Sequence, residues 1–209
     1  MTDPFPSSEF DQWADSYDQS TRTENIFPFD GYEQVLDTTL RQAAPRPGMS
    51  VLDIGTGTGN LALRFATQDC DLVCTDFSES MLTKARAKLP SARFIKHDFR
   101  TAWPAELEGR RFDRIVSAYV FHHVGQRQKV DICQKLVTQH LKPRGKLIIA
   151  DLSFPTLSYM EMFRQRVGDL WEDEPYWIVS TAIPALENTG LQVEYTQVSA
   201  CAGVYTIQS

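Results

Sequence analysis

The chain has 209 residues, of which 42% are hydrophobic and 23% charged, and its formal net charge is −6 at pH 7. This length and composition are typical of one globular domain, and no apolar stretch in the sequence is long enough to span a membrane. The negative charge and the lack of a Lys- and Arg-rich run argue against nucleic acid as a partner, and the N-terminal sequence has no secretion signal, so a cytoplasmic location is expected.

The four cysteines are scattered and show neither C-x-x-C nor paired spacing. Cysteine is among the residues most often buried, so we expect reduced thiols in the interior and no metal site. These residues are Cys70, Cys74, Cys133 and Cys201.

Two helices are predicted ahead of the main body of the chain. The first covers about residues 8–18, where aromatic side chains recur at helical spacing and form one face: Phe10, Trp13 and Tyr17. The second opens at Asp30, with Glu33 three residues later in the pattern of a capping box, and runs to about residue 45. The polar residues 21–28 between the helices are predicted to form a loop.

Residues 51–60, with the sequence V-L-D-I-G-T-G-T-G-N, predict a buried strand, a tight loop and the start of a helix. Gly55, Gly57 and Gly59 let the backbone turn sharply and let a ligand lie against the main chain. The start of the helix adds unpaired N–H groups. These features together indicate a ligand-binding loop.

The spacing and charge of this loop limit the choice of ligand. A phosphate-binding loop ends in a Lys, and residues 55–60 contain none; the dinucleotide fingerprint needs its third glycine where this chain has Asn60. Asp53, close before the loop, would repel a pyrophosphate and attract a cation. A nicotinamide-dependent oxidoreductase is therefore disfavoured, and a positively charged ligand is expected.

From residue 50 onward, apolar runs alternate with amphipathic stretches, which predicts strands alternating with helices. The expected strands are 50–54, 72–75, 92–95, 112–117 and 146–150. The expected helices are 61–68, a helix capped by Ser78 and ending at 89, and 126–141, with a break at 142–145. This alternation predicts an α/β fold in which helices cover both faces of a parallel sheet.

Acidic residues follow three consecutive predicted strands. Asp53, Asp76 and Asp98 each stand at the C-terminal end of a strand, and parallel sheets bind ligands along that edge. Asp76 lies about twenty residues beyond the glycine loop, where a carboxylate can accept hydrogen bonds from the hydroxyls of a ribose. We expect the three carboxylates to lie in one crevice.

The C-terminal part has a different composition. Residues 152–180, which we call the lid, are rich in aromatic side chains and are predicted to form a helical insertion over the ligand edge of the sheet. Most of these aromatic side chains are expected to serve packing, and a minority to face a substrate. A last helix at about 182–188 and two strands, 192–199 and 204–207, are predicted to close the sheet as an antiparallel hairpin.

The D-x-G-x-G-x-G pattern of residues 53–59 resembles the cofactor motif of the class I S-adenosylmethionine-dependent methyltransferases. The resemblance implies a Rossmann-like, seven-stranded, mostly parallel sheet with an antiparallel C-terminal hairpin. It also implies S-adenosyl-L-methionine as the cofactor. Within this family, residues 167–171 and 201–204 look like those of the YrrT-like bacterial methyltransferases, whose acceptor is not well defined.

The resemblance also implies roles for residues. Asp76 would hold the ribose, Asp98 and the backbone of Phe99 the adenine, and Asp53 the ammonium group, in part through water. The backbone of Gly55 and Ser117 would hold the methionine end. An N-terminal helix with the F-D-x-x-A-x-x-Y-D element of residues 10–18 often covers the cofactor in this family. The full expected cofactor set is Tyr17, Asp53, Gly55, Thr56, Gly57, Gly59, Asp76, Phe77, Asp98, Phe99 and Ser117.

His122 and His123 are the candidate catalytic residues, because they follow the fourth strand near the expected position of the methyl group. Either could act as a general base, since a neutral imidazole titrates near physiological pH. A purely structural turn is the alternative, and methyl transfer can also proceed by in-line positioning without a base. The N-P-P-Y-type sequence of enzymes that methylate nucleobases or protein glutamine is absent here.

The sequence therefore predicts methyl transfer from S-adenosylmethionine to a small-molecule acceptor. The alternative is a regulatory protein that binds S-adenosylmethionine or S-adenosylhomocysteine without transferring the methyl group. We expect a single domain, 1–209, made of an N-terminal helical part (1–45), a cofactor-binding core (46–151), the lid (152–180) and the closing segment (181–209). The sequence allows a homodimer without requiring one.

Overall fold

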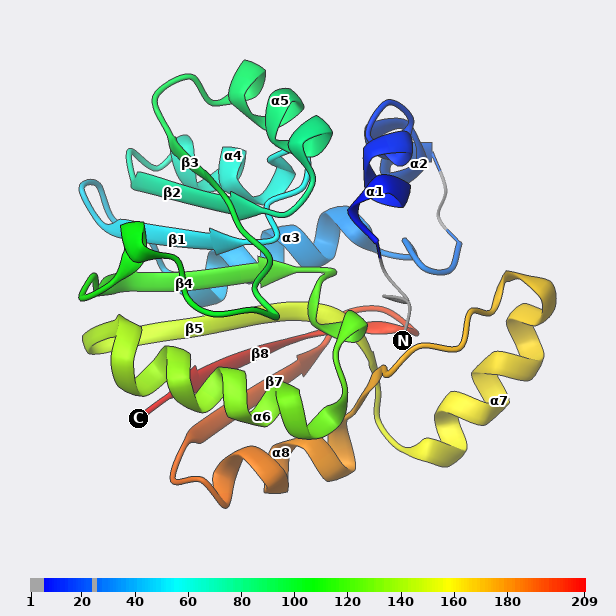
Figure 1. Ribbon diagram of the computed structural model, residues 1–209. Coiled ribbons are helices and arrows are strands. Elements are labelled where there is room, and N and C mark those ends of the chain that lie inside the picture. Colours follow the sequence, from blue (N-terminus) through cyan, green and yellow to red (C-terminus); the bar gives the residue numbers. More distant parts are fainter. Residues whose placement is uncertain (1–5, 24–25) are drawn as a thin grey trace.

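The computed structural model describes residues 6–23 and 26–209, which form an α/β structure around one mixed sheet (Figure 1). The strands are β1 (Ser50–Ile54), β2 (Asp71–Asp76), β3 (Arg93–Lys96), β4 (Phe112–Ala118), β5 (Leu141–Phe154), β6 (Trp177–Ile178), β7 (Gln192–Gln197) and β8 (Ala202–Gln208). The helices are α1 (Ser7–Trp13), α2 (Tyr17–Thr23), α3 (Tyr32–Ala43), α4 (Asn60–Ala66), α5 (Glu79–Lys88), α6 (Gln126–Lys135), α7 (Leu157–Val167) and α8 (Val179–Glu187).

The strand order is β3-β2-β1-β4-β5-β8-β7, and the short β6 pairs with β5 off this path. The strands β1 to β5 run parallel to their neighbours, whereas β8 is antiparallel to both β5 and β7. The predicted mostly parallel sheet with an antiparallel closing hairpin is confirmed. Parallel pairing places the C-terminal ends of β1, β2 and β4 at one edge, beside α1, α2 and the lid (Figure 1).

The interior consists of two hydrophobic clusters, one on each face of the sheet. Neighbouring strand residues point to opposite faces, so Val51 belongs to one cluster and Leu52 to the other. The first cluster is covered by α3 and α4, and the second by α6 and α8. The near-continuous apolar runs of β1, β4 and β5 are explained by this burial on both faces.

The N-terminal helices differ from the prediction. The expected helix 8–18 is two helices, α1 and α2, with a turn between them, and α2 continues through residues 21–23, which were expected in a loop. The capping box at Asp30 was wrong, because α3 starts at Tyr32 after Gly31, which has φ +74° and makes no side-chain cap. By contrast, the predicted cap at Ser78 is confirmed: its Oγ accepts a hydrogen bond from Met81 N at 3.1 Å.

The fifth strand is longer than expected in both directions. The predicted break at 142–145 lies inside β5 as an irregular stretch in the pairing with β4, with Arg144 at φ +64°. At the other end β5 runs through residues 152–154, which were expected in the helical lid. The lid itself is helical in α7 and in a short 3-10 turn, Gly168–Leu170, and after β6 its last two residues begin α8. This lid continues the sheet as well as covering it.

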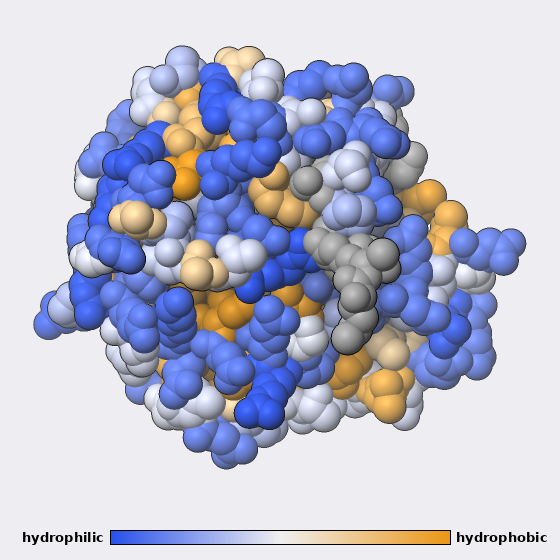
Figure 2. Space-filling model, in the orientation of Figure 1, coloured by the Kyte–Doolittle hydropathy of each residue, from blue (hydrophilic) through white to orange (hydrophobic). Residues whose placement is uncertain are grey.

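The molecular surface in Figure 2 is mostly hydrophilic, and hydrophobic residues reach it in small separate patches. The most exposed large apolar side chains in the described part of the chain are Leu157 at 64% and Met162 at 59%, both on α7. Every described helix is too short or too polar to cross a membrane.

Candidate active site

The glycine loop between β1 and α4 requires glycine for two reasons: neighbouring side chains lie close to its backbone, and its backbone conformation is left-handed. Gly55 has φ +66°, and a Cβ added there would collide with the side chain of Val120. Gly59 has φ +87°, and its Cβ would lie 3.3 Å from that of Ala85, so this glycine lets α4 pack closely on α5. Gly57 has φ +54° and open space beside it. Left-handed conformation favours glycine at all three positions.

A cavity of about 760 Å³ lies between this loop, the α1–α2 pair and the lid. All but two of the predicted site residues line it; the exceptions are Gly59 and Ser117. Ser117 is fully buried, and its Oγ donates a hydrogen bond to Ile54 O at 2.8 Å, which ties β4 to β1. The predicted residues that line the cavity are Tyr17, Asp53, Gly55, Thr56, Gly57, Asp76, Phe77, Asp98, Phe99, His122 and His123.

Asp53 has a buried carboxylate in which only one of the two oxygens accepts a hydrogen bond from the described part of the chain. Its Oδ2 accepts a hydrogen bond from Thr56 Oγ1 at 2.7 Å, whereas Oδ1 has no partner among the described residues. Burial raises the pKa of Asp53 to about 7, against the opposing effect of the Thr56 hydrogen bond. A buried acceptor at the wall of a cavity fits the ammonium group of the expected cofactor.

Asp76 organises the loop from the neighbouring strand. Its Oδ2 accepts from Gly57 N at 2.8 Å and its Oδ1 from Ser78 N at 2.9 Å. Burial raises the pKa of Asp76 to about 6, although these backbone donors favour the charged form. The carboxylate fixes the main chain of the glycine loop, and each oxygen keeps a further lone pair for a ligand hydroxyl.

Asp98 has a partner that the sequence analysis missed. Arg100 Nη2 lies 2.8 Å from Asp98 Oδ2, and the Arg100 backbone N–H donates to Asp98 Oδ1 at 2.9 Å. The guanidinium of Arg100 also lies 5.5 Å from the centre of the Phe77 ring. Asp98 and Arg100 therefore form a charge-paired wall of the cavity rather than a free carboxylate.

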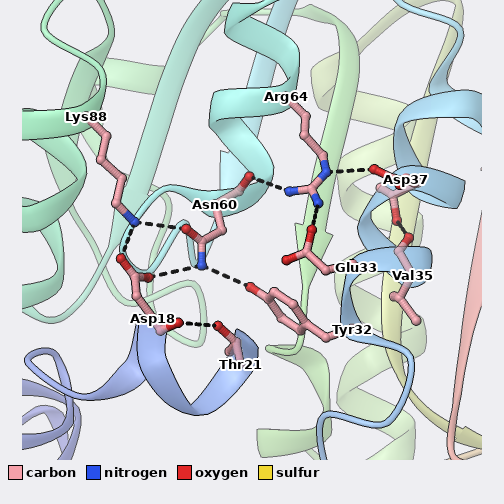
Figure 3. A network of polar contacts seen from close by, with 10 residues as sticks. Asp18, Thr21, Tyr32, Glu33, Val35, Asp37, Asn60, Arg64 and Lys88 are labelled. Atoms are coloured by element: carbon pink, nitrogen blue, oxygen red, sulfur yellow. Dashed lines mark hydrogen bonds and ion pairs between the residues drawn. The ribbon is translucent and has the colours of Figure 1, made fainter. Parts of the chain in front are cut away.

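The α2 helix is fastened to the glycine loop by a polar network centred on Asp18 (Figure 3). Asp18 Oδ1 accepts from Thr58 Oγ1 at 2.5 Å and from Asn60 Nδ2 at 3.1 Å, and Oδ2 pairs with Lys88 Nζ at 2.6 Å. Lys88 Nζ also donates to Asn60 Oδ1 at 2.8 Å. Asn60, which distinguishes this loop from the dinucleotide fingerprint, thus joins three helices.

The α1 helix is fastened to the start of α5. Asp11 Oδ1 accepts from Ser78 Oγ at 2.5 Å and from Ser80 N at 3.1 Å. These hydrogen bonds lower the pKa of Asp11. Phe10 of the same helix lies with its ring 4.9 Å from that of Phe77 and 5.4 Å from that of His123. The α1–α2 pair therefore forms one wall of the cavity.

Tyr17, the first residue of α2, is partly buried and packs among aromatic side chains that include two buried tyrosines, Tyr32 and Tyr119. Its ring lies 4.8 Å from that of Trp13, and its hydroxyl shares a hydrogen bond with Tyr32. The ring of Tyr119 lies 5.3 Å from that of Tyr32. Tyr119 has φ +58°, which is unusual for a residue with a side chain, and its buried hydroxyl has no hydrogen-bond partner among the described residues.

At the far end of the cavity, His122 is oriented by a buried carboxylate. His122 Nδ1 lies 2.5 Å from Asp151 Oδ1, and Asp151 Oδ2 accepts from Trp177 Nε1 at 3.1 Å. Burial opposes a charge on the imidazole, but the pKa of His122 is raised because the Asp151 carboxylate outweighs burial. Asp151 was not predicted as a site residue, although it directly follows the predicted strand 146–150 and lies in β5 of the structure.

His123 and Glu174 complete this end. Glu174, from the lid, places Oε2 3.7 Å from His122 Nε2 and Oε1 3.6 Å from His123 Nδ1. Burial and the neighbouring His122 lower the pKa of His123. The Nζ of Lys129, which is fully buried, donates to Pro175 O, and burial lowers the pKa of Lys129 to about 8. Glu174 and Lys129 lie on segments that no sequence motif singled out.

Comparisons of the sequence with known proteins find methyltransferases. A family model described as a methyltransferase domain matches residues 51–145. An uncharacterized methyltransferase of Geobacillus sp. (strain WCH70) is 32% identical over 202 residues, which cover 91% of this chain and 92% of that protein. Another, from Geobacillus thermodenitrificans (strain NG80-2), is 31% identical over 91% of each chain.

Solved structures resemble the chain in fold at low identity. DhpI in complex with SAM and HEP gives a TM-score of 0.74 at 17% identity, over 97% of this chain and 95% of that one. The magnesium protoporphyrin IX methyltransferase ChlM from Synechocystis PCC 6803, with bound SAH, gives 0.67 at 16% identity, over 97% and 99%.

Proposed function

This chain belongs to the family of class I S-adenosylmethionine-dependent methyltransferases, and on that premise we propose that it transfers the methyl group to a small-molecule acceptor. The glycine loop with Asp53, Asp76 and Asp98 forms the donor end of the cavity. The acceptor end consists of His122, His123, Asp151 and Glu174.

The size and boundaries of the cavity carry this proposal. Its volume of about 760 Å³ lies within the range of about 300–1,000 Å³ for cofactor and small-molecule sites. The α1–α2 pair covers one side and the lid another, so the room left beside a nucleoside cofactor suits a small acceptor better than a macromolecule. The net charge of −6 is a second reason against nucleic acid.

S-adenosylmethionine, when bound, supplies a methyl carbon on a positively charged sulfur that is open to in-line attack. At the donor end we assign the ammonium group to Asp53, the ribose to Asp76, and the adenine to the backbone of Phe99 beside the Asp98–Arg100 pair. The backbone of Gly55 lies against the methionine part. Tyr17, on the helix that covers the loop, excludes water from this end.

At the acceptor end we assign the activation of the acceptor to His122 and His123. The Asp151 carboxylate holds the His122 ring in one orientation, which leaves Nε2 directed toward Glu174 and the cavity. A ring held in this way can act on the nucleophile without first losing rotational freedom. Ser117 and Gly59 support the site through packing and hydrogen bonding outside the cavity wall.

Calorimetric titration with S-adenosylmethionine and S-adenosylhomocysteine tests the donor end. We expect both to bind, and failure of both to bind at millimolar concentration would overturn the proposal. Incubation with methyl-labelled donor and a cell extract tests the acceptor. Label should appear in the low-molecular-weight fraction; label confined to protein or nucleic acid would exclude a small-molecule acceptor.

Four further statements stay predictions from the sequence. They are the YrrT-like subtype, a cytoplasmic location, the division of the single domain at residues 45, 151 and 180, and a homodimer that the sequence allows.

A further inference from the structure

We propose that His122, His123 and Glu174 form a binding site for a divalent first-row transition metal ion of the Zn²⁺ type. Each of the three side chains offers one ligand atom, and these atoms all lie within 4.8 Å of one another. The Glu174 oxygens lie 3.7 Å from His122 Nε2 and 3.6 Å from His123 Nδ1.

These separations are close to those of a formed site. Zn²⁺ binds imidazole nitrogen and carboxylate oxygen at about 2.0–2.2 Å, so the ligand atoms of a tetrahedral site lie about 3.3–3.6 Å apart. The two Glu174 separations need to shorten by a few tenths of an ångström, whereas the three ligand atoms together span up to 4.8 Å, so the widest separation has to close by about 1.2 Å through rotation of the side chains.

The groups behind His122 fit a metal ligand. Asp151 lies 2.5 Å from His122 Nδ1, and Asp151 itself accepts from Leu152 N at 2.8 Å and from Trp177 Nε1 at 3.1 Å. Histidine ligands in metal sites regularly donate a hydrogen bond from the N–H of their second ring nitrogen to such a carboxylate. This hydrogen bond fixes the tautomer and makes the metal-binding nitrogen more basic. With the proton on Nδ1, the lone pair of His122 Nε2 points toward Glu174.

The charges also call for a cation at this point. When His122 is neutral with its proton on Nδ1, Nε2 and the Glu174 carboxylate are both acceptors, and their approach to 3.7 Å favours a cation between them, either a metal ion or a second proton on the ring. Lys129 supplies one positive charge near Asp151, but its Nζ is directed to Pro175 O. Two carboxylates and one ammonium leave a net negative charge at the acceptor end.

The three ligands leave one side of the site open to the cavity, which all of them line. Three protein ligands with an open fourth position are typical of catalytic metal sites, and His₂Glu is one of the established zinc sets. With the metal bound, His122 and His123 would be ligands rather than general bases, and an acceptor with an oxygen, nitrogen or sulfur atom could complete the coordination and be activated there. This last step rests on the proposed function, whereas metal binding itself does not.

Titration of the purified full-length protein with Co²⁺, followed by visible absorption and calorimetry, tests the site without cofactor or acceptor. We expect one Co²⁺ per chain, in competition with Zn²⁺. Glu174→Gln and His123→Ala each remove one ligand and should weaken binding at least tenfold. Asp151→Asn should weaken it by about 10- to 100-fold through His122, with circular dichroism and thermal unfolding reporting whether the variant folds.

Two control variants exclude other ligands. His140→Gln removes a histidine that packs on Trp103 away from the cavity, and Cys70→Ser removes the one cysteine, of four within the described residues, that is not buried. Both should bind Co²⁺ as the wild type does. The proposal is overturned if the wild type binds no Co²⁺, if Glu174→Gln and His123→Ala bind it unchanged, or if Cys70→Ser abolishes binding. Binding of S-adenosylmethionine is measured separately by calorimetry. If the protein binds this cofactor, the proposed function stands even when the metal site is overturned.

Discussion

The donor end of the cavity is held mainly by backbone groups of two neighbouring strand-to-helix turns, whereas the acceptor end is held by side chains from distant segments. At the donor end, Asp76 accepts from the main chain at Gly57 and Ser78. At the acceptor end, His122 and His123 follow β4, Asp151 belongs to β5, and Glu174 to the lid. A site made by backbone tolerates few substitutions in its loop, while a site made by side chains can change its chemistry one residue at a time. This difference explains how one donor site can serve many acceptors.

Gly55→Ala should break the donor end most severely. The added Cβ would collide with Val120 and would also stand at φ +66°. Overpacking costs about 1–3 kcal/mol and the left-handed conformation about 1–2 kcal/mol, so we expect the free energy of unfolding to fall by about 2–5 kcal/mol. Denaturant unfolding measures this, with loss of S-adenosylmethionine binding in parallel.

Gly48→Ala is the matched control for that variant. Gly48 has φ +77° and no atom within 4 Å of an added Cβ, so this variant should show only the conformational cost of about 1–2 kcal/mol. Addition of Val120→Ala to Gly55→Ala should recover part of the loss. Equal destabilisation by the two glycine variants would show that close approach at Gly55 is unimportant.

His122→Gln should affect the acceptor end and leave the donor end intact. Removal of the imidazole removes both its proton-accepting nitrogen and its pairing with Asp151, so we expect the rate of methyl transfer to fall by about a hundredfold. The affinity for S-adenosylmethionine, measured by calorimetry, should stay within about twofold, which would be a free-energy change below about 0.5 kcal/mol. His140→Gln, away from the cavity, is the control. A large loss of donor affinity in His122→Gln would mean that the two ends are not separate.

Asp76→Ala should weaken binding of S-adenosylmethionine by about 1.5–3 kcal/mol, or about 10- to 150-fold, because a charged hydrogen-bond acceptor is lost. The variant also leaves Gly57 N and Ser78 N without their partner. Asp71→Ala, at the exposed beginning of the same strand, should have little effect. Calorimetry at one pH compares the two, and equal affinities would remove Asp76 from the ribose site.

Asp53→Asn should raise stability while it lowers affinity. The folded pKa of about 7 exceeds the unfolded value of 3.8, so folded protein binds the proton more tightly and stability falls as pH rises from about 4 to 7. The amide side chain of Asp53→Asn does not ionise, so the variant does not lose stability as the pH rises. We therefore expect it to be more stable than the wild type at pH 8 by about 1–2 kcal/mol.

The same titration predicts the pH dependence of donor binding. Ionised Asp53 attracts the ammonium group, so wild-type affinity for S-adenosylmethionine should rise between pH 5.5 and 7.5, and the affinity of Asp53→Asn should change less. Thermal unfolding and calorimetry across this range measure both effects. A wild type and variant with parallel pH profiles would contradict the assignment of Asp53.

The sequence predicted the donor end well because its determinants are local. The motif of residues 53–59 fixes the loop, and the rule that ligands bind at the C-terminal ends of parallel strands brought Asp76 and Asp98 to the same crevice. The same rule would have found Asp151, which directly follows the predicted strand 146–150, although in the structure it lies inside the longer β5. The fold class and the closing hairpin followed from the alternation of strands and helices.

The contacts between distant segments could not be predicted. Glu174 reaches His122 only because β6 pairs with β5 and turns the lid back over the cavity, and a two-residue strand has no recognisable periodicity. Arg100 was not predicted as the partner of Asp98, because nothing in the sequence shows that the side chain two residues later folds back onto the carboxylate. The turn between α1 and α2 was missed because the aromatic face continues across it.

Lys88→Met should produce the smallest of these effects and tests how the donor end is closed. Lys88 pairs with Asp18 at 2.6 Å, and both side chains are largely shielded, at 24% and 31% exposure. The pair fastens α2 to α5, so its loss should weaken donor binding by about 0.5–1 kcal/mol, less at high salt. Lys84→Met removes the comparable but exposed pair with Asp15 and should leave the affinity unchanged. If the two variants behave alike, the Asp18 network does not close the donor end, and the aromatic packing of Tyr17 and Trp13 must hold α2 over the loop by itself.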